Sequence, residues 1–146
     1  MLGLIQRVQA AQVEVDGKLV GKINQGILLL LGVQKEDDAA LSDKLLHKVI
    51  NYRIFEDDDG KMNNSLLDID GELLVVSQFT LPANTKKGLR PSFTSAANPE
   101  LGKTMYDYFV EQATEKLSKP IQTGEFGADM QVSLINDGPV TFWLEV

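Results

Sequence analysis

The sequence predicts a single α+β domain of mostly antiparallel β-sheet with two main helices. A length of 146 residues and an apolar content of 43% are sufficient for one compact core. Short strand-like segments separated by turn residues dominate the pattern, and only two stretches have helical spacing. No internal repeat, low-complexity tract or linker divides the chain, so we expect residues 1–146 to form one domain.

The first strands are indicated by alternation and by a turn. Residues 13–20 alternate in polarity around Asp16-Gly17, a dipeptide typical of tight hairpins. Residues 26–33 (GILLLLGV) form a continuous apolar run that is too short for a typical helix. The sequence therefore predicts a hairpin followed by a buried strand.

The first helix is expected to begin after Asp37 and Asp38, which can cap it, and to end near Tyr52. At about 100° per residue, His47 lies opposite the apolar arc of this helix and is expected to be solvated. That arc consists of Leu41, Leu45, Leu46, Val49 and Ile50.

The second helix has clearer boundaries. Asn98 is the predicted N-cap, Pro99 occupies the first helical position, and Pro120 follows the end. Its apolar stripe is predicted at i, i+4 spacing, through Leu101, Met105, Phe109, Ala113 and Leu117.

The remaining strands are predicted at residues 72–79, 130–135 and 140–146, with turns at Asp59-Gly60 and Asp70-Gly71. This order favours hairpin-connected antiparallel sheets over a βαβ array. The last strand has one apolar face, which we expect to pack against a partner subunit. Trp143 lies on the other face of this strand. The members of the apolar face are Val140, Phe142, Leu144 and Val146.

Composition restricts the chemistry. The chain has no cysteine and one histidine, which excludes disulfides, cysteine nucleophiles, histidine triads and zinc sites with several histidines. Catalysis must then come from carboxylates, hydroxyls, backbone groups or the substrate. No membrane-length apolar run and no signal peptide is recognisable, so a cytoplasmic protein without membrane contact is expected.

The net charge of −7 argues against a broad basic face for nucleic acid. A local basic cluster is present at Lys86, Lys87 and Arg90, with Lys103 further along the chain. This cluster is either a local RNA contact or an ordinary solvated loop.

Clustered carboxylates at residues 56–59 invite a metal interpretation. However, Lys61 occupies the next ligand position of a calcium loop, and Gly60 is misplaced for one. A solvated turn explains the segment better.

Two further segments are candidate sites. Residues 77–81 (SQFTL) place polar side chains at the end of a strongly apolar strand, where sites are often built, although their hydroxyls could instead satisfy nearby backbone groups. Residues 136–141 (NDGPVT) are either a simple turn or a loop with a cis Gly138-Pro139 bond, which would orient two carbonyls similarly. The sequence leaves the isomer open.

These two motifs, together with RPSF at 90–93 and RVQAAQVEVDG at 7–17, resemble the bacterial and eukaryotic type of D-aminoacyl-tRNA deacylase. The resemblance covers essentially the whole chain. It implies a barrel-like core and a homodimer with active sites at the subunit interface. The implied activity is hydrolysis of D-aminoacyl-tRNA, and of glycine mischarged on other tRNAs, with L-aminoacyl substrates rejected. The implied partner is the 3′-terminal aminoacyl-adenosine of tRNA, and no cofactor is expected.

The same resemblance implies roles for individual residues. The site would be lined by Ser77, Gln78, Phe79 and Thr80, with backbone N–H groups near Phe79 and Thr80 as the oxyanion hole. Gly138-Pro139 of the partner, in cis, would be inserted as a chirality gate. The implied supporting residues are Phe126 and Met130 on the adenine side and Arg7 as a brace for the Gly-Pro loop. Gly102 departs from the family, in which alanine is common, so any contact from that position is in doubt.

An aminoacyl ester is an activated acyl group whose hydrolysis needs water, an oxyanion hole and positioning. The neighbouring ribose 2′-hydroxyl can orient or activate that water, a route suited to a chain without cysteine or a usable histidine. Thr80 is the alternative nucleophile, but no base is adjacent to it in the sequence.

Two other functions are compatible with parts of the sequence. The basic loop would suit a non-enzymatic RNA-binding β-barrel, although such modules present aromatic side chains on a basic groove. The carboxylates of residues 57–59 would suit a metal-dependent phosphoesterase.

Overall fold

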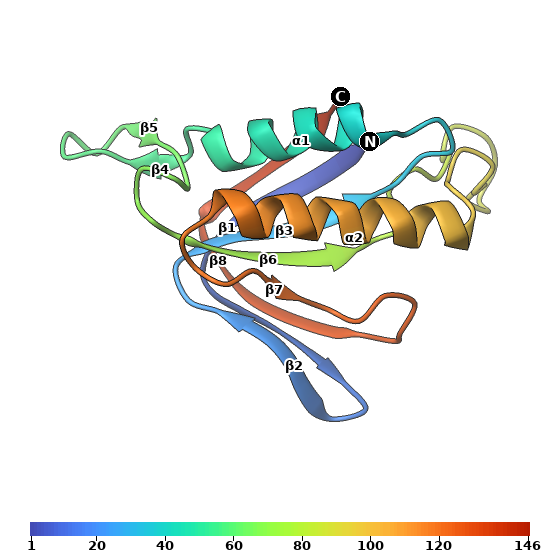
Figure 1. Ribbon diagram of the computed structural model, residues 1–146, viewed down its shortest axis with the longest axis horizontal. Coiled ribbons are helices and arrows are strands. Elements are labelled where there is room, and N and C mark those ends of the chain that lie inside the picture. Colours follow the sequence, from blue (N-terminus) through green and yellow to red (C-terminus); the bar gives the residue numbers. More distant parts are fainter.

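The computed structural model describes all 146 residues and has two helices packed on one side of a curved sheet (Figure 1). The six strands of the main sheet are β1 (Leu2–Val15), β2 (Lys18–Ile23), β3 (Gly26–Gly32), β6 (Glu72–Ser77), β7 (Gln122–Thr123) and β8 (Gln131–Glu145). The helices are α1 (Ala39–Asn51) and α2 (Pro99–Lys116). A separate small hairpin is formed by β4 (Phe55–Glu56) and β5 (Met62–Asn64).

The main sheet is mixed, with the order β2-β1-β3-β6-β7 and with β8 paired to β1. The β1 pairs are antiparallel, as predicted, whereas β6 is parallel to both β3 and β7. The prediction of hairpin connections was therefore wrong for β6. Parallel neighbours require a crossover, and α1 and α2 lie in the two connecting segments.

The sheet curls until its two edges approach each other. Thr123 of β7 lies so close to Gly21 of β2 that a Cβ added at Gly21 would be 2.3 Å from the Thr123 carbonyl oxygen. The Lys22 N–H donates to Gln122 Oε1 at 3.4 Å across the same gap. The sheet is thus nearly a barrel.

The N-cap residues predicted from the sequence mark where the two helices begin. Asp38 caps α1 by accepting from the Leu41 N–H, and Asn98 caps α2 by accepting from the Leu101 N–H. His47 is exposed, as predicted. Asp37 does not cap α1, because its buried carboxylate accepts from the Met1 amino group at 2.7 Å.

The apolar stripe of α2 is rotated relative to the prediction. Leu101, Met105 and Leu117 are only half-buried. The fully buried face consists of Gly102, Tyr106, Phe109 and Ala113. This rotation turns Gly102 and Tyr106 toward the sheet.

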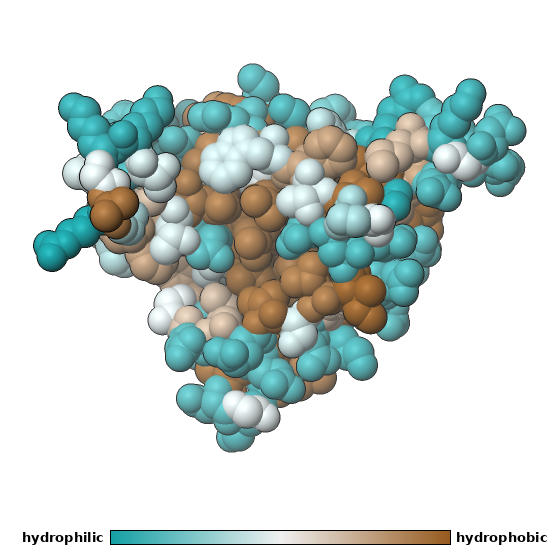
Figure 2. All heavy atoms as spheres, turned by 180° about the vertical axis from the view of Figure 1, so that it is seen from behind, coloured by the Kyte–Doolittle hydropathy of each residue, from teal (hydrophilic) through white to brown (hydrophobic).

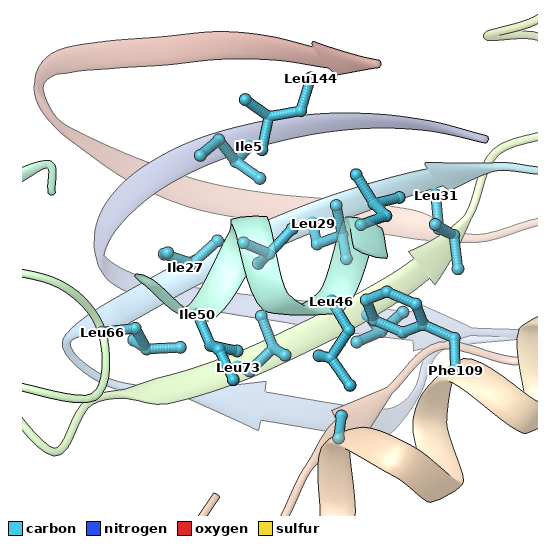
Figure 3. Packing of buried hydrophobic residues seen from close by; sticks show 14 of the residues in the cluster. Ile5, Ile27, Leu29, Leu31, Leu46, Ile50, Leu66, Leu73, Phe109 and Leu144 are labelled. Atoms are coloured by element: carbon cyan, nitrogen blue, oxygen red, sulfur yellow. The ribbon is translucent and has the colours of Figure 1, made fainter. Parts of the chain in front are cut away.

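The main core lies between the helices and the sheet, where side chains of α1 and α2 interdigitate with those of β1, β3 and β6 (Figure 3). Two parts of the last-strand prediction were wrong. The predicted strands at 130–135 and 140–146 form one long strand, β8. Its apolar face packs into the core of its own chain, since Val140 and Leu144 are buried there and Phe142 and Val146 pack against them.

On the opposite face of the sheet a second hydrophobic cluster is buried, and other apolar side chains stay exposed. The second cluster consists of Val8, Ala11, Val13, Ile23, Leu28, Leu74 and Val76. Leu4 of β1 is paired with Leu30 of β3 on one side and with Trp143 of β8 on the other, so the three share one face. Leu4 and Leu30 are half-buried, and Trp143 is 50% exposed. Figure 2, which shows this side of the molecule, has apolar residues gathered in its middle and polar residues around them.

Neither helix is both long and apolar enough to span a membrane.

Candidate active site

A pocket of about 390 Å³ opens where β6 ends and α2 begins. Its volume falls within the range of small-molecule sites, and its walls are mainly apolar. The lining comes from the end of β3, the segment after β6, the chain before α2, one face of α2 and the segment after β7. These residues are Leu31, Val33, Ser77, Gln78, Phe79, Phe93, Ala96, Ala97, Asn98, Pro99, Gly102, Tyr106, Phe126 and Gly127.

The polar motif enters this pocket because β6 is held against β3. Ser77 pairs with Leu31, and the Gln78 N–H donates to the Leu31 carbonyl at 2.8 Å, which extends the parallel pairing by one residue. The chain then turns, with the Leu81 N–H donating to the Gln78 carbonyl at 3.2 Å. The polar side chains therefore leave the core at the rim of the pocket.

Two backbone donors at this turn have no acceptor in the chain. The N–H groups of Phe79 and Thr80 make no hydrogen bond, whereas those of Gln78 and Leu81 on either side do. Adjacent unpaired N–H groups at the edge of an apolar pocket can stabilise a developing oxyanion.

The Thr80 hydroxyl does not line the pocket directly. Its oxygen accepts a hydrogen bond from Gln78 Nε2 at 2.6 Å, and no carboxylate or imidazole is bonded to it. Thr80 thus lacks the adjacent base that activates a hydroxyl nucleophile. The Gln78 contact instead fixes the position of the hydroxyl.

Tyr106 forms part of the inner wall of the pocket, and its hydroxyl donates to the Val75 carbonyl at 2.8 Å. Its ring is tilted against that of Phe126 at a centroid distance of 5.7 Å. Burial, together with the nearby Asp107 charge, raises the pKa of Tyr106 to about 12. Tyr106 therefore stays protonated at neutral pH and anchors α2 to the strand that delivers the motif.

The pocket lining contains no Asp, Glu, His or Cys. The acidic segment lies elsewhere, in the β4–β5 hairpin, where the Asp57 carboxylate accepts from the Lys61 N–H at 3.0 Å and the Asp59 N–H at 2.9 Å. These backbone hydrogen bonds, with that from Lys61 first, lower the pKa of Asp57. No group of three or more His, Cys, Asp or Glu side chains is arranged to hold a metal ion.

The second motif lies within β8, where it bulges out as a braced loop between Asn136 and Thr141, the residues paired with Val8 and Gln6 of β1. The Gly138-Pro139 peptide bond is cis. Arg7, which is buried, donates from Nε to the Asp137 carbonyl at 2.9 Å and from Nη1 to the Ile54 carbonyl at 2.7 Å. The Val140 N–H donates to Asn136 Oδ1 at 2.9 Å, which closes the loop from the other side.

Gly138 and Pro139 are exposed and do not line the pocket of their own chain. Arg7 pairs with Ile27 near the start of β3, whereas the pocket contacts Leu31. The four intervening steps span roughly 13 Å at about 3.3 Å per residue. In one chain the two motifs therefore lie beside opposite ends of β3.

Several predicted site residues come together and others do not. Ser77, Gln78, Phe79 and Phe126 line the pocket, and Thr80 is tied to it through Gln78. Met130 packs with the second hydrophobic cluster, outside the lining. Gly102 does line the pocket, where an added Cβ would lie 3.5 Å from Phe126 Cζ.

Sequence reasoning missed the walls supplied by α2 and the segment before it. Tyr106 is one residue from the predicted stripe position Met105, so a helical phase shifted by one residue would have found it. Phe93 was part of the RPSF motif, but only the fold shows that it lines the pocket together with Phe79. The centroids of the two rings are 5.4 Å apart.

Comparisons with known proteins find similarity over nearly the whole chain. The family model described as D-Tyr-tRNA(Tyr) deacylase matches residues 4–145. A protein of Pseudoalteromonas translucida named D-aminoacyl-tRNA deacylase is 65% identical, and one of Haemophilus influenzae with the same name is 58% identical, each over the full length of both chains.

Two solved structures share the fold. One, named c-Myc DNA Unwinding Element Binding Protein, has a TM-score of 0.96 at 40% identity and covers 100% of this chain and 99% of its own. The other, described as a probable eukaryotic D-amino acid tRNA deacylase, has a TM-score of 0.84 at 16% identity and covers 99% of this chain and 98% of its own.

The role of the Tyr106 hydroxyl gives the first prediction. Tyr106→Phe should lower the unfolding free energy at pH 7 by about 0.5–1.5 kcal/mol, because a buried hydrogen bond to Val75 is lost. The folded-state pKa of about 12 lies above the ordinary value of 10.0, so the stabilisation is present below pH 10 and is lost as the pH rises toward 12. Urea unfolding from pH 7 to pH 12 should show this alkaline loss in the parent and a smaller one in the variant.

The matched control is Tyr52→Phe, because the Tyr52 hydroxyl makes no hydrogen bond while its ring packs on Phe142. An identical alkaline loss of stability in Tyr106→Phe and in the parent would contradict the assignment.

Proposed function

The chain belongs to the D-Tyr-tRNA(Tyr) deacylase family, and we propose how its site performs the reaction of that family. The reaction is the hydrolysis of the ester that joins a D-amino acid to tRNA. The comparisons do not favour the non-enzymatic RNA-binding barrel. The observation that carries the proposal is the pair of unbonded N–H groups at Phe79 and Thr80, on the rim of an apolar pocket.

In the proposed complex the terminal adenosine occupies the apolar pocket. Flat aromatic rings and apolar walls suit a base, because every nucleobase has a face that stacks on aromatic side chains. Phe126 and Tyr106 on the inner side, and Phe79 and Phe93 on the outer side, supply such rings. The aminoacyl ester then lies at the rim, beside the N–H groups of Phe79 and Thr80.

Hydrolysis at this position uses the substrate as well as the protein. Water attacks the ester carbonyl, the two N–H groups stabilise the negative charge on the carbonyl oxygen, and the ester then breaks to free amino acid and tRNA. The ribose 2′-hydroxyl orients the attacking water, since the pocket lining provides no carboxylate or imidazole to act as a base. Thr80, held by Gln78, positions the ester.

The chirality gate is proposed to come from a second copy of the chain. Gly138 and Pro139 are exposed, braced by Arg7 and distant from the pocket of their own chain, so they can reach a pocket only by insertion from a partner. The apolar sheet face that includes Leu4, Leu30 and Trp143 offers the surface on which two copies would pack. Trp143 lies on β8 with the Gly-Pro loop, which links the packing face to the gate.

A gate made of main chain would select by exclusion. Its carbonyls meet the α-carbon of the substrate, hold the amine and hydrogen of a D-residue, and collide with an L side chain. Glycine has no side chain to exclude, so glycyl-tRNA mischarged on other tRNAs is also proposed to be cleaved. We propose that the enzyme works in the cytoplasm, where aminoacyl-tRNA is its substrate.

The direct test of function compares D-Tyr-tRNA with L-Tyr-tRNA, each with and without EDTA. We expect cleavage of the D-substrate, sparing of the L-substrate and no effect of EDTA, because the proposed chemistry uses backbone donors and the substrate hydroxyl. An RNA-binding module would cleave neither substrate, and a phosphoesterase dependent on the Asp57–Asp59 carboxylates would stop in EDTA.

A second prediction separates positioning from nucleophilic catalysis at Thr80. Thr80→Ala should retain measurable turnover, with a loss of about 100-fold or less from mispositioning, whereas removal of a true nucleophile costs on the order of 10⁶. Single-turnover kinetics on D-Tyr-tRNA measure the loss.

Thr114→Ala is the control, since it removes a hydroxyl on the outer surface of α2 that bonds only to the Val110 carbonyl. A trapped acyl-enzyme in the parent, together with complete inactivity of Thr80→Ala, would reverse the assignment.

A further inference from the structure

Charge is distributed unevenly along this acidic chain. The net charge is −7, yet residues 73–99 contain no Asp or Glu and include Lys86, Lys87 and Arg90. This stretch begins within β6, supplies the site motif and ends at the start of α2. The part of the chain that forms the rim of the pocket is therefore locally positive.

The three cations lie at the tip of a loop whose base is fixed. Asn84 and Ser92 pair through two backbone hydrogen bonds, of 2.7 and 3.1 Å, and Ser95 Oγ donates to the Pro82 carbonyl at 2.8 Å. All five residues of the tip, 86–90, are exposed. Figure 1 shows this loop in yellow, projecting beyond the start of α2.

None of these cations is neutralised within the chain. The ion pairs involve Met1, Arg7 and Lys103 as their basic partners, and Lys103 on α2 is held by Asp107 at 2.6 Å. Lys86, Lys87 and Arg90 have no acidic partner within reach. Three like charges within five residues repel one another, so their clustering favours an anionic ligand.

The loop is attached directly to the wall of the pocket. Phe93 follows the base of the loop, its ring lies against that of Phe79, and both line the pocket. When the terminal adenosine fills the pocket, the phosphates that precede it in the RNA must leave through the mouth beside this loop. This step rests on the proposed function.

We propose that Lys86, Lys87 and Arg90 bind the phosphate backbone of the tRNA acceptor end. The contact is electrostatic and reads no sequence, which suits an enzyme that acts on many tRNAs. It also accounts for how an acidic protein holds RNA, because three positive charges without acidic partners are gathered beside the mouth where the phosphates would arrive. Leu89, fully exposed within the tip, lies among the cations and is the side chain that a protein partner would bury instead.

The test uses a variant with Lys86→Gln, Lys87→Gln and Arg90→Gln, and a control with Lys18→Gln, Lys61→Gln and Lys119→Gln. Both lose three exposed positive charges, but the control positions lie on β2, in the β4–β5 turn and after α2. Each protein is assayed on D-Tyr-tRNA across a salt series and on 3′-O-D-tyrosyl-adenosine, which has no phosphate.

For D-Tyr-tRNA, log kcat/KM of the parent should fall with log salt concentration. The slope should be shallower by about 2.1–2.7 in the loop variant, since each of its three lost phosphate contacts removes about 0.7–0.9 from the slope. The control should keep the parent slope. On 3′-O-D-tyrosyl-adenosine all three proteins should have equal kcat/KM.

An unchanged slope in the loop variant would overturn the proposal while leaving the deacylase function intact. An equal loss on 3′-O-D-tyrosyl-adenosine would overturn it in favour of damage to the pocket. A change in sedimentation of the loop variant would overturn it in favour of a contact between protein subunits. A parent that cleaves neither substrate would instead show that the proposed function itself is wrong.

Discussion

The parallel pairing of β3 with β6 is the constraint on which the rest of the molecule depends. Both strands are apolar on both faces, so they can be stable only in the centre of a covered sheet. The two backbones approach so closely at Gly26 that a Cβ there would lie 1.8 Å from the Glu72 carbonyl oxygen. Because this register is fixed, β6 ends opposite Leu31, and its polar continuation emerges at the edge where α2 begins.

In the proposed mechanism, catalysis depends on the positioning of the substrate more than on reactive side chains. The pocket has apolar walls, two unpaired backbone donors and a hydroxyl held by an amide, and the substrate brings both an activated ester and a neighbouring hydroxyl. Tyr106 keeps its proton and binds the Val75 carbonyl, so it shapes the site without taking part in the chemistry. The proposed chirality gate follows the same principle, since Gly138-Pro139 would act through main chain in a loop that Arg7 braces.

Features encoded locally could be predicted from the sequence, and features set by distant segments could not. The Asp16-Gly17 turn and the caps at Asp38 and Asn98 are signals within a few residues, and the structure confirms them. The parallel neighbours of β6 and the inward face of β8 depend on which segments meet in space, which no local pattern records. The candidate site divides in the same way. The polar strand end was visible as a motif, whereas its wall at Gly102 and Tyr106 looked like the edge of an ordinary core stripe.

The central claim is that each complete site combines the pocket of one chain with the Gly-Pro loop of another, and mixed dimers test it most directly. Gly102→Leu fills the pocket, and Pro139→Glu places a carboxylate on the gate, so each variant alone should be inactive on D-Tyr-tRNA. Random mixing makes half of the dimers mixed, each with one intact site, and roughly a quarter of the parent activity should return. If differently tagged variants co-purify as mixed dimers and no activity returns, the shared site is contradicted.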